Sequence, residues 1–198
     1  MFLLALSGSI ATGKSTILAM FKDEGIATIS ADEIVKQLYQ NEAVKPISQI
    51  FPKSIKNGTI DKQALSLLLL AQPEKFDVLE AIIHPLVQEK LQQFIKIQQK
   101  LGQKLLVIEI PLLFETTNKY DFDAILVSFV DEETQAKRAL KRGGMSKEKL
   151  EMILAKQVSQ KEKIKRADFT IDSSNSLQEV RNQVKEIIST ILNKQAKK

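Results

Sequence analysis

The chain contains no cysteine and no tryptophan, and it has a single histidine. Without cysteine, a disulfide framework and a cysteine-based metal site are excluded, and a reducing, cytoplasmic location is favoured. Long hydrophobic runs are also absent, since no apolar stretch of the sequence approaches the roughly 20 residues that cross a membrane. We therefore expect a cytoplasmic protein without a membrane partner.

Aromatic residues make up only 6% of the chain, and no basic stretch carries interleaved aromatic side chains that could stack on bases. Nucleic acid is therefore not an expected partner, although the formal net charge is +5. A mild positive excess instead helps to attract phosphorylated ligands. The length of 198 residues suits one compact domain, residues 1–198, with an inserted subdomain. We expect a monomer or a small homo-oligomer.

The apolar start of the chain, from Phe2 to Leu6, allows two interpretations. A secretory signal peptide needs a positively charged beginning and a longer apolar run, and both are missing here. Five or six apolar residues instead suit a buried parallel strand. A loop with glycines, a helix over residues 14–23 and a second strand over residues 26–30 follow. This strand–helix–strand order predicts a parallel sheet with a right-handed crossover.

Three further strands are predicted nearer the C-terminus, over residues 104–110, 124–129 and 167–171. Residues 132–141 and 147–158 have helical patterns. The last helix begins at Ser176, where Glu179 three positions later completes a capping box. One apolar face of that helix should cover the sheet, and it consists of Leu177, Val180, Val184, Ile187, Ile188 and Ile191.

A long insertion, residues 33–102, separates the second strand from the third. About 70 residues are far more than one crossover helix requires. The pattern is nearly all helical, with breaks predicted at Pro46, Pro52, Asn57, Gly58, Pro73 and Pro85. We expect a helical subdomain beside the sheet, which in a phosphate-binding enzyme is a natural place to hold a second substrate.

The segment from Gly8 to Ser15 matches the pattern GxxxxGK[ST] at every specified position, between a predicted strand and a predicted helix. The two glycines let the backbone turn tightly and direct N–H groups at phosphate oxygens. The Lys14 ammonium can reach the β- and γ-phosphates of ATP, and the Ser15 hydroxyl can bind Mg²⁺. The sequence thus predicts an α/β fold, a three-layer P-loop NTPase core with a five-stranded parallel sheet. The expected nucleotide-binding residues are Gly8, Ser9, Ile10, Ala11, Thr12, Gly13, Lys14, Ser15 and Thr16.

Carboxylates follow the ends of predicted strands, where an open α/β sheet faces its ligand crevice. Asp32 can accept a proton from an attacking hydroxyl, or it can cap the helix that follows, and its position alone favours neither role. Glu109, near the end of the third strand, and Glu115, after the PLLF turn, can each support Mg²⁺. Glu109 is also consistent with a polar residue that has its own buried partner.

Arginine is rare and occurs only at Arg138, Arg142, Arg166 and Arg181. The first two are four residues apart on one predicted helix, so they share a face. Arginine suits the bridging of transferring phosphates, and a mobile helical lid over residues 132–166 would close over the nucleotide. A solvated basic face that includes Lys137 and Lys141 is equally consistent with this spacing.

The single histidine, His84, lies in the IIHPLV segment of the insertion, where a lone histidine beside apolar residues more often has a structural role. Residues 118–121 spell NKYD, the guanine-binding pattern of GTPases. In those proteins the pattern follows the end of a strand, whereas here it precedes one. We interpret it as a chance match.

Several segments together resemble the dephospho-coenzyme A kinase family, from residue 4 to about residue 172: LSGSIATGKST, ADEIV, IIHPLV, IPLLFE, ETQAKRALKR and ADFTID. The resemblance implies a P-loop kinase with a helical coenzyme A subdomain and a lid. It also implies ATP-dependent phosphorylation of the ribose 3′-hydroxyl of dephospho-coenzyme A. The alternatives are a nucleoside or nucleotide kinase of similar architecture, or a non-enzymatic ATP-binding switch.

The resemblance also assigns roles to residues. Asp32 matches the catalytic aspartate of the family, and Arg138 and Arg142 match its lid arginines. The family often carries an asparagine near the adenine, where residues 173–175 of this chain read SSN. The residues expected to contact the acceptor, besides Asp32, are His84, Leu112 and Glu115.

Overall fold

A computed structural model describes residues 1–116 and 120–196 of the chain. The chain divides into two compact units, which are described separately: Met1–Ser30 together with Gln98–Lys198, and Ala31–Ile97. Two residues of the NKYD motif, Asn118 and Lys119, lie outside the described part. Among the described residues, no helix combines the length and the apolar composition that crossing a membrane requires.

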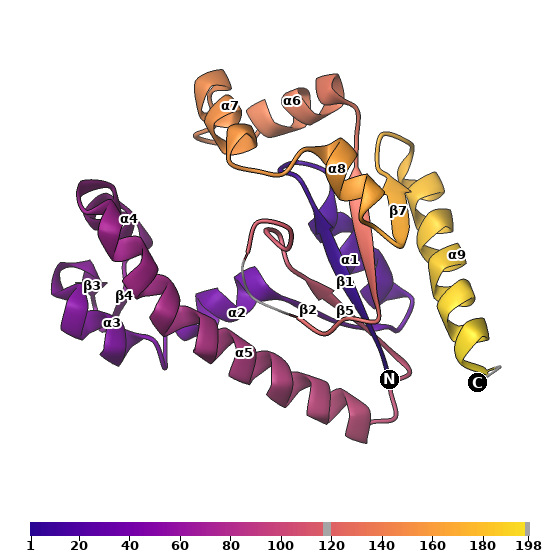
Figure 1. The fold of residues 1–198 in the computed structure, drawn as a ribbon, viewed down its shortest axis with the longest axis horizontal. Helices are drawn as coiled ribbons and strands as arrows, with labels where there is room; N and C mark the ends of the chain where they lie inside the picture. The colour runs from indigo at the N-terminus through magenta and orange to yellow at the C-terminus, as the bar shows by residue number, and fades with distance from the viewer. Residues whose placement is uncertain (117–119, 197–198) are drawn as a thin grey trace. The chain divides into compact units, whose positions relative to one another are not determined.

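The first unit is built on a five-stranded parallel sheet with the order β2-β5-β1-β6-β7 (Figure 1). The strands are β1 (Phe2–Gly8), β2 (Ala27–Ser30), β5 (Leu105–Glu109), β6 (Ala124–Phe129) and β7 (Phe169–Asp172). The predicted α/β class and five-stranded parallel sheet are therefore confirmed. Strand β1 lies at the centre, and the chain runs to β2 on one side of it and later to β6 on the other. The carboxyl end of β1 is thus the switch point at which open α/β sheets bind ligands.

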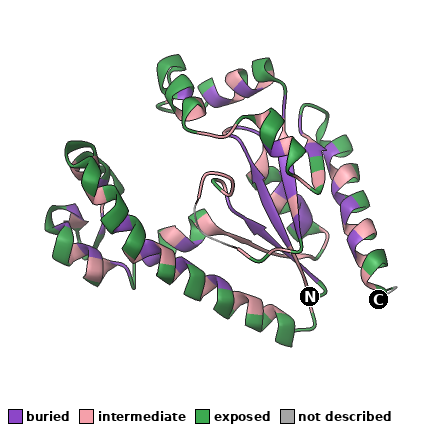
Figure 2. Ribbon diagram, in the orientation of Figure 1, coloured by how far each residue is buried: buried purple, intermediate pink, exposed green. Residues whose placement is uncertain are grey.

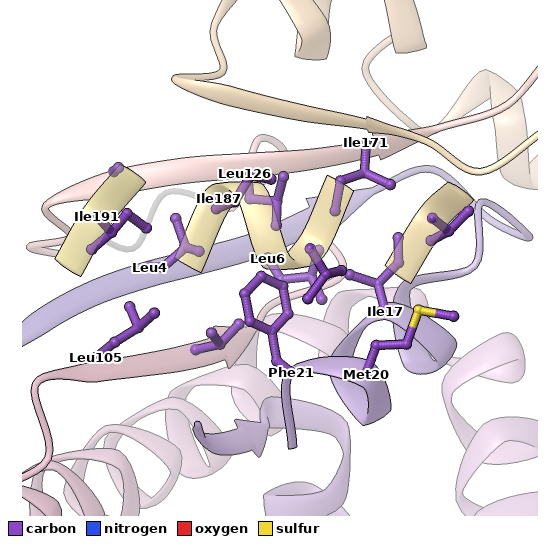
Figure 3. Packing of buried hydrophobic residues seen from close by; sticks show 14 residues of the cluster. Leu4, Leu6, Ile17, Met20, Phe21, Leu105, Leu126, Ile171, Ile187 and Ile191 are labelled. Atoms are coloured by element: carbon purple, nitrogen blue, oxygen red, sulfur yellow. The ribbon is translucent and has the colours of Figure 1, made fainter. Parts of the chain in front are cut away.

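Helices α1 (Lys14–Asp23) and α9 (Leu177–Ala196) contact each other and pack on the sheet. Their buried side chains, including Ile17, Phe21 and Ile187, meet Leu6 and Leu126 of the strands in one apolar cluster (Figure 3). The central strands are almost entirely buried (Figure 2). Burying each such side chain contributes about 1.5–3 kcal/mol, so the central strand and the loop that follows it have a rigid base.

The predicted capping box at the start of α9 is present. The Ser176 backbone N–H donates to Glu179 Oε2 at 2.9 Å, and the Glu179 N–H donates to Ser176 Oγ at 3.3 Å. The predicted apolar face is correct for Val180, Val184, Ile187 and Ile191, which are buried. Leu177 is an exception, because 68% of it is exposed in the first turn of the helix.

Three short helices connect β6 to β7: α6 (Glu132–Leu140), α7 (Lys147–Ala155) and α8 (Gln160–Lys165). The single helix predicted over residues 147–158 is therefore wrong at its end. The cause is Ser159, whose hydroxyl accepts a hydrogen bond from the Glu162 N–H at 3.2 Å and begins a new helix. Residues 156–159 form a non-helical connection between α7 and α8.

The second unit is mostly helical, with α2 (Ala31–Leu38), α3 (Val44–Ile50), α4 (Lys62–Ala71) and the first part of α5 (Phe76–Lys100). Two short 3₁₀ helices, η1 (Pro52–Ser54) and η2 (Pro73–Lys75), begin at prolines that were predicted as breaks. At Asn57 and Gly58 the chain forms a tight hairpin between β3 (Ile55–Lys56) and β4 (Thr59–Ile60), which an all-helical pattern did not predict.

The break predicted at Pro85 is wrong, because Pro85 lies inside the 25-residue helix α5. Proline removes one backbone hydrogen bond and normally kinks or ends a helix. Here the buried residues Leu79, Ile83, Val87 and Leu91 recur at helical spacing on both sides of it. This continuous apolar face outweighs the lost hydrogen bond, since tertiary packing supplies most of the stability of a helix in a protein.

Candidate active site

The loop between β1 and α1 has backbone angles and close contacts that restrict which residues can occupy it. Gly13, the N-cap of α1, has φ 81° in the left-handed region, and Ala11 has φ 63°. At Gly8, an added β-carbon would lie 2.5 Å from both the carbonyl oxygen and the hydroxyl of Ser128. Thr12 is buried and holds the turn, because its hydroxyl donates to Ser9 O at 2.9 Å and lies 2.8 Å from Ser128 Oγ.

The loop forms a cationic cradle for an anion. Lys14 Nζ donates to the carbonyl oxygens of Gly8 at 3.0 Å and of Ser9 at 2.9 Å. No acidic residue occupies the first turn of α1, so the N–H groups and the positive dipole end of the helix face an anion without competition. Ser15 and Thr16 are exposed at this helix end. The residues predicted to bind the nucleotide, from Gly8 to Thr16, therefore form the end of β1, the loop after it and the first turn of α1.

A pocket of about 330 Å³ adjoins the loop. Gly13 and Thr16 line it together with Arg138 and Arg142. Arg138 is held in place by Ser173, because its Nη1 donates to Ser173 Oγ at 3.0 Å and its Nη2 to Ser173 O at 2.7 Å. Two arginines thus line a pocket beside the phosphate-binding loop, and guanidinium groups are well suited to bind phosphate.

Sequence reasoning missed part of this pocket. Leu177 and Val180 line it as well, although their spacing predicted only that they cover the sheet. Ser173 and Asn175 also line it, and the segment that contains them was singled out by the family resemblance alone. The clue in the sequence is their place directly after β7, at the same sheet edge as the loop.

Glu109 and Ser15 were predicted to support Mg²⁺. Glu109 ends β5, is 6% exposed, and pairs in register with Leu6 of β1 and Ser30 of β2. No cluster of three or more His, Cys, Asp or Glu side chains suited to a metal occurs in the described part of the chain. Mg²⁺ bound to nucleotides uses one or two protein oxygens plus phosphates and water, so a hydroxyl and a carboxylate at this edge fit that ion.

Glu115 has partners within the first unit. Its Oε1 accepts a hydrogen bond from the Val158 N–H at 2.9 Å and lies 2.8 Å from Nζ of the fully buried Lys163. The guanidinium of Arg166 lies 4.9 Å from the centre of the Phe114 ring. Glu115 therefore joins the loop after β5 to α8. Leu112, in the same loop, is 50% exposed.

Asp32 and His84 lie in the second unit. Helix α2 begins at Ala31, so Asp32 is exposed within its first turn. The alternative role of Asp32 as an N-cap is therefore wrong, because the helix starts one residue earlier. His84 is half-buried on α5, between the buried residues Ile83 and Val87.

The parallel sheet, the GxxxxGK[ST] loop at its switch point and the paired arginines define the class of P-loop phosphotransferases. Comparison with known families is more specific. Residues 2–179 match the family model described as dephospho-CoA kinase. The chain is 43% identical over 191 residues to a dephospho-CoA kinase from Rhizobium meliloti (strain 1021), covering 96% of this chain and 98% of that protein. It is 40% identical over 188 residues to one from Rhodopseudomonas palustris (strain CGA009), covering 95% and 94%. The chain belongs to the dephospho-CoA kinase family.

Solved structures agree with this fold. A Thermus thermophilus protein described as TT1252 has a TM-score of 0.82 at 27% identity, covering 96% of this chain and 97% of that one. Dephospho-CoA kinase from Campylobacter jejuni has a TM-score of 0.66 at 29% identity, covering 96% of each chain. Shikimate kinase from Bacteroides thetaiotaomicron shares only the fold, with a TM-score of 0.55 at 11% identity.

Proposed function

We propose that the protein transfers the γ-phosphoryl group of ATP to the ribose 3′-hydroxyl of dephospho-coenzyme A, which yields coenzyme A and ADP. The observation that carries the proposal is a complete phosphate-binding loop beside a pocket with two arginines, in a chain of the dephospho-CoA kinase family. In the transfer, the acceptor oxygen forms a bond to the γ-phosphorus while the bond from that phosphorus to the β–γ bridging oxygen breaks. The hydroxyl proton leaves to a base.

The cations of the first unit stabilise the charge on the transferring group. The loop N–H groups and Lys14 bind the β- and γ-phosphates, and Arg138 and Arg142 approach from the adjoining pocket. Ser15 and Glu109 would hold Mg²⁺, which neutralises charge on the phosphate oxygens when it is bound. Residues 132–166, which include both arginines, act as the lid in this proposal.

Asp32 is the proposed general base, which orients and deprotonates the 3′-hydroxyl. It follows the last residue of β2 by only two positions along the chain. The helical insertion, residues 33–102, would bind the pantetheine and diphosphate parts of the acceptor near His84, while Leu112 and Glu115 of the loop after β5 are the other proposed acceptor contacts. We also propose a cytoplasmic location and a monomer or small homo-oligomer, without nucleic acid as a partner.

An acceptor panel tests the function. ADP formation with ATP and Mg²⁺ is compared for dephospho-coenzyme A, nucleosides, nucleoside monophosphates and no acceptor. We expect turnover only with dephospho-coenzyme A. Turnover with a nucleoside or a monophosphate instead would leave the loop chemistry in place and contradict the acceptor. If none of the acceptors increases ADP formation, the result would favour an ATP-binding switch.

A further inference from the structure

The peptide groups at Ile10, in the phosphate-binding loop, are held on both sides by glutamine side chains. The Ile10 N–H donates to Gln157 Oε1 at 3.2 Å, and the Ser9 hydroxyl donates to the same oxygen at 2.6 Å. The Ile10 carbonyl oxygen accepts from Gln135 Nε2 at 2.8 Å. The backbone determines the orientation of both amides, because an N–H requires an oxygen opposite it and a carbonyl requires an NH₂ group.

Gln135 is itself fixed. It is 4% exposed, and its Oε1 accepts a hydrogen bond from Gln160 Nε2 at 3.2 Å. Gln160 in turn bonds to both the N–H and the carbonyl oxygen of Val130, each at 3.1 Å. A chain of hydrogen bonds therefore runs from Val130, the residue after β6, through α8 and α6 to the loop. Connected polar networks of this kind define a single arrangement of the groups they join.

Gln157 projects from residues 156–159, the connection between α7 and α8, and this connection has a second anchor. The neighbouring Val158 N–H donates to Glu115, which pairs with the fully buried Lys163. The apolar tip of the loop also contacts α6 and α7, because Ala11 is buried in one cluster with Ala139 of α6 and Leu150 of α7, against which Ile10 packs.

The loop needs such support at this point. Ala11, directly after Ile10, has φ 63°, which is strained for a residue with a β-carbon and persists only where the surroundings enforce it. The loop N–H groups act on a phosphate only when they point toward it. A rotation of the peptide between Ser9 and Ile10 would alter the cradle that Lys14 completes.

We propose that Gln157 and Gln135 are positioning residues of the phosphoryl-transfer reaction, which fix the Ser9–Ile10 stretch of the loop and join it to helices α6, α7 and α8. The inference rests on the proposed kinase function. Neither glutamine is assigned a contact with substrate, and both act through the loop backbone.

The test compares three variants with the wild-type enzyme. Gln157→Leu removes the acceptor oxygen at similar size, and we expect kcat to fall about tenfold or more, as two hydrogen bonds are lost. Gln157→Glu keeps an oxygen that accepts both bonds but adds a negative charge near the phosphates. It should raise KM for ATP and leave kcat within about twofold, the signature of weakened ground-state binding. Glu186→Ala, at an exposed position of α9 outside the proposed lid, is the control and should change neither value.

A second readout does not depend on turnover. Amide hydrogen exchange at Ile10, followed by NMR, should accelerate in Gln157→Leu and stay protected in Gln157→Glu. Unchanged kcat in Gln157→Leu, or unchanged Ile10 exchange, would overturn the proposal. If Gln157→Leu does not fold, Gln157→Asn, which is one methylene too short to reach the loop, gives the same comparison. If the wild-type enzyme shows no acceptor-dependent turnover, the kinase function fails, while Ile10 exchange still tests the support of the loop.

Discussion

At Gly8 the chain passes so close to β6 that a β-carbon would lie 2.5 Å from two oxygen atoms of Ser128 and 2.7 Å from Thr12 Oγ1. One of those oxygens belongs to the backbone of a buried strand and cannot move aside cheaply. Gly8→Ala should therefore displace the loop and abolish measurable ATP binding by calorimetry. Gly25→Ala is the matched control, because Gly25 also has a positive φ but its β-carbon would meet nothing within 4 Å, and it should bind ATP like the wild-type protein. Normal ATP affinity in Gly8→Ala would contradict this geometry.

Asp32 is the residue on which the proposed proton transfer depends. Asp32→Asn keeps the size of the side chain and removes the base, so turnover should fall by ~10²–10⁴ while ATP affinity stays unchanged. The neighbour Glu33 offers a control, since it is an exposed acid whose Oε2 lies 2.9 Å from Lys36 Nζ. Steady-state kinetics of Glu33→Gln should match the wild-type enzyme. If Asp32→Asn turned over like Glu33→Gln, another group would have to be the base.

Among the elements, helix α6 depends on its cap at Asp131, whose Oδ1 accepts a hydrogen bond from the Thr134 N–H at 2.8 Å. That backbone hydrogen bond is the main cause that lowers the pKa of Asp131 below its ordinary value. A lowered pKa in the folded state contributes stability that is present above the unfolded pKa, about 3.9, and is lost as pH falls through the folded pKa.

The expected result is that Asp131→Ala is less stable than the wild-type protein at pH 7. The difference should shrink once the pH is low enough to protonate Asp131 in the folded protein. Urea unfolding of both proteins, at pH 7 and at the acidic pH, measures this difference in stability. The exposed acid Glu151 of α7 provides a control, as Glu151→Ala leaves the cap intact. A stability difference for Asp131→Ala that is independent of pH would rule out the charged cap.

The elements also show which parts of the fold could be predicted from the sequence. Helix α1 has its predicted bounds, and the strands lie within about two residues of theirs, because short apolar runs and the glycines of the loop are local signals. The break predicted at Pro85 is wrong, because tertiary packing overrides a local breaker. The break predicted at Asn57 is correct, but the short hairpin around it was not predicted. Gln157 lies in none of the segments singled out in the sequence, and Gln135 lies in the ETQAKRALKR segment without a role of its own; only the fold brings both to Ile10.

For the whole molecule, the formal net charge of +5 acts on every encounter with a polyanionic substrate. Salt screens such attraction over a Debye length of about 10 Å at 0.1 M. We expect kcat/KM for ATP to fall as potassium chloride is raised from low to high concentration, with kcat changing little because bound phosphates are less screened. Sucrose at matched osmolality serves as the control. A kcat/KM that is independent of salt would show that the net charge does not assist binding.

The measurement that tests the central claim most directly is the fate of the γ-phosphate. ATP labelled in that phosphate is incubated with dephospho-coenzyme A and the enzyme, and the labelled product is located by phosphorus NMR. The account predicts that the label appears on the ribose 3′-oxygen with the wild-type enzyme and does not appear with Lys14→Ala. Label recovered only as inorganic phosphate, or on another oxygen of the acceptor, would contradict the proposed reaction.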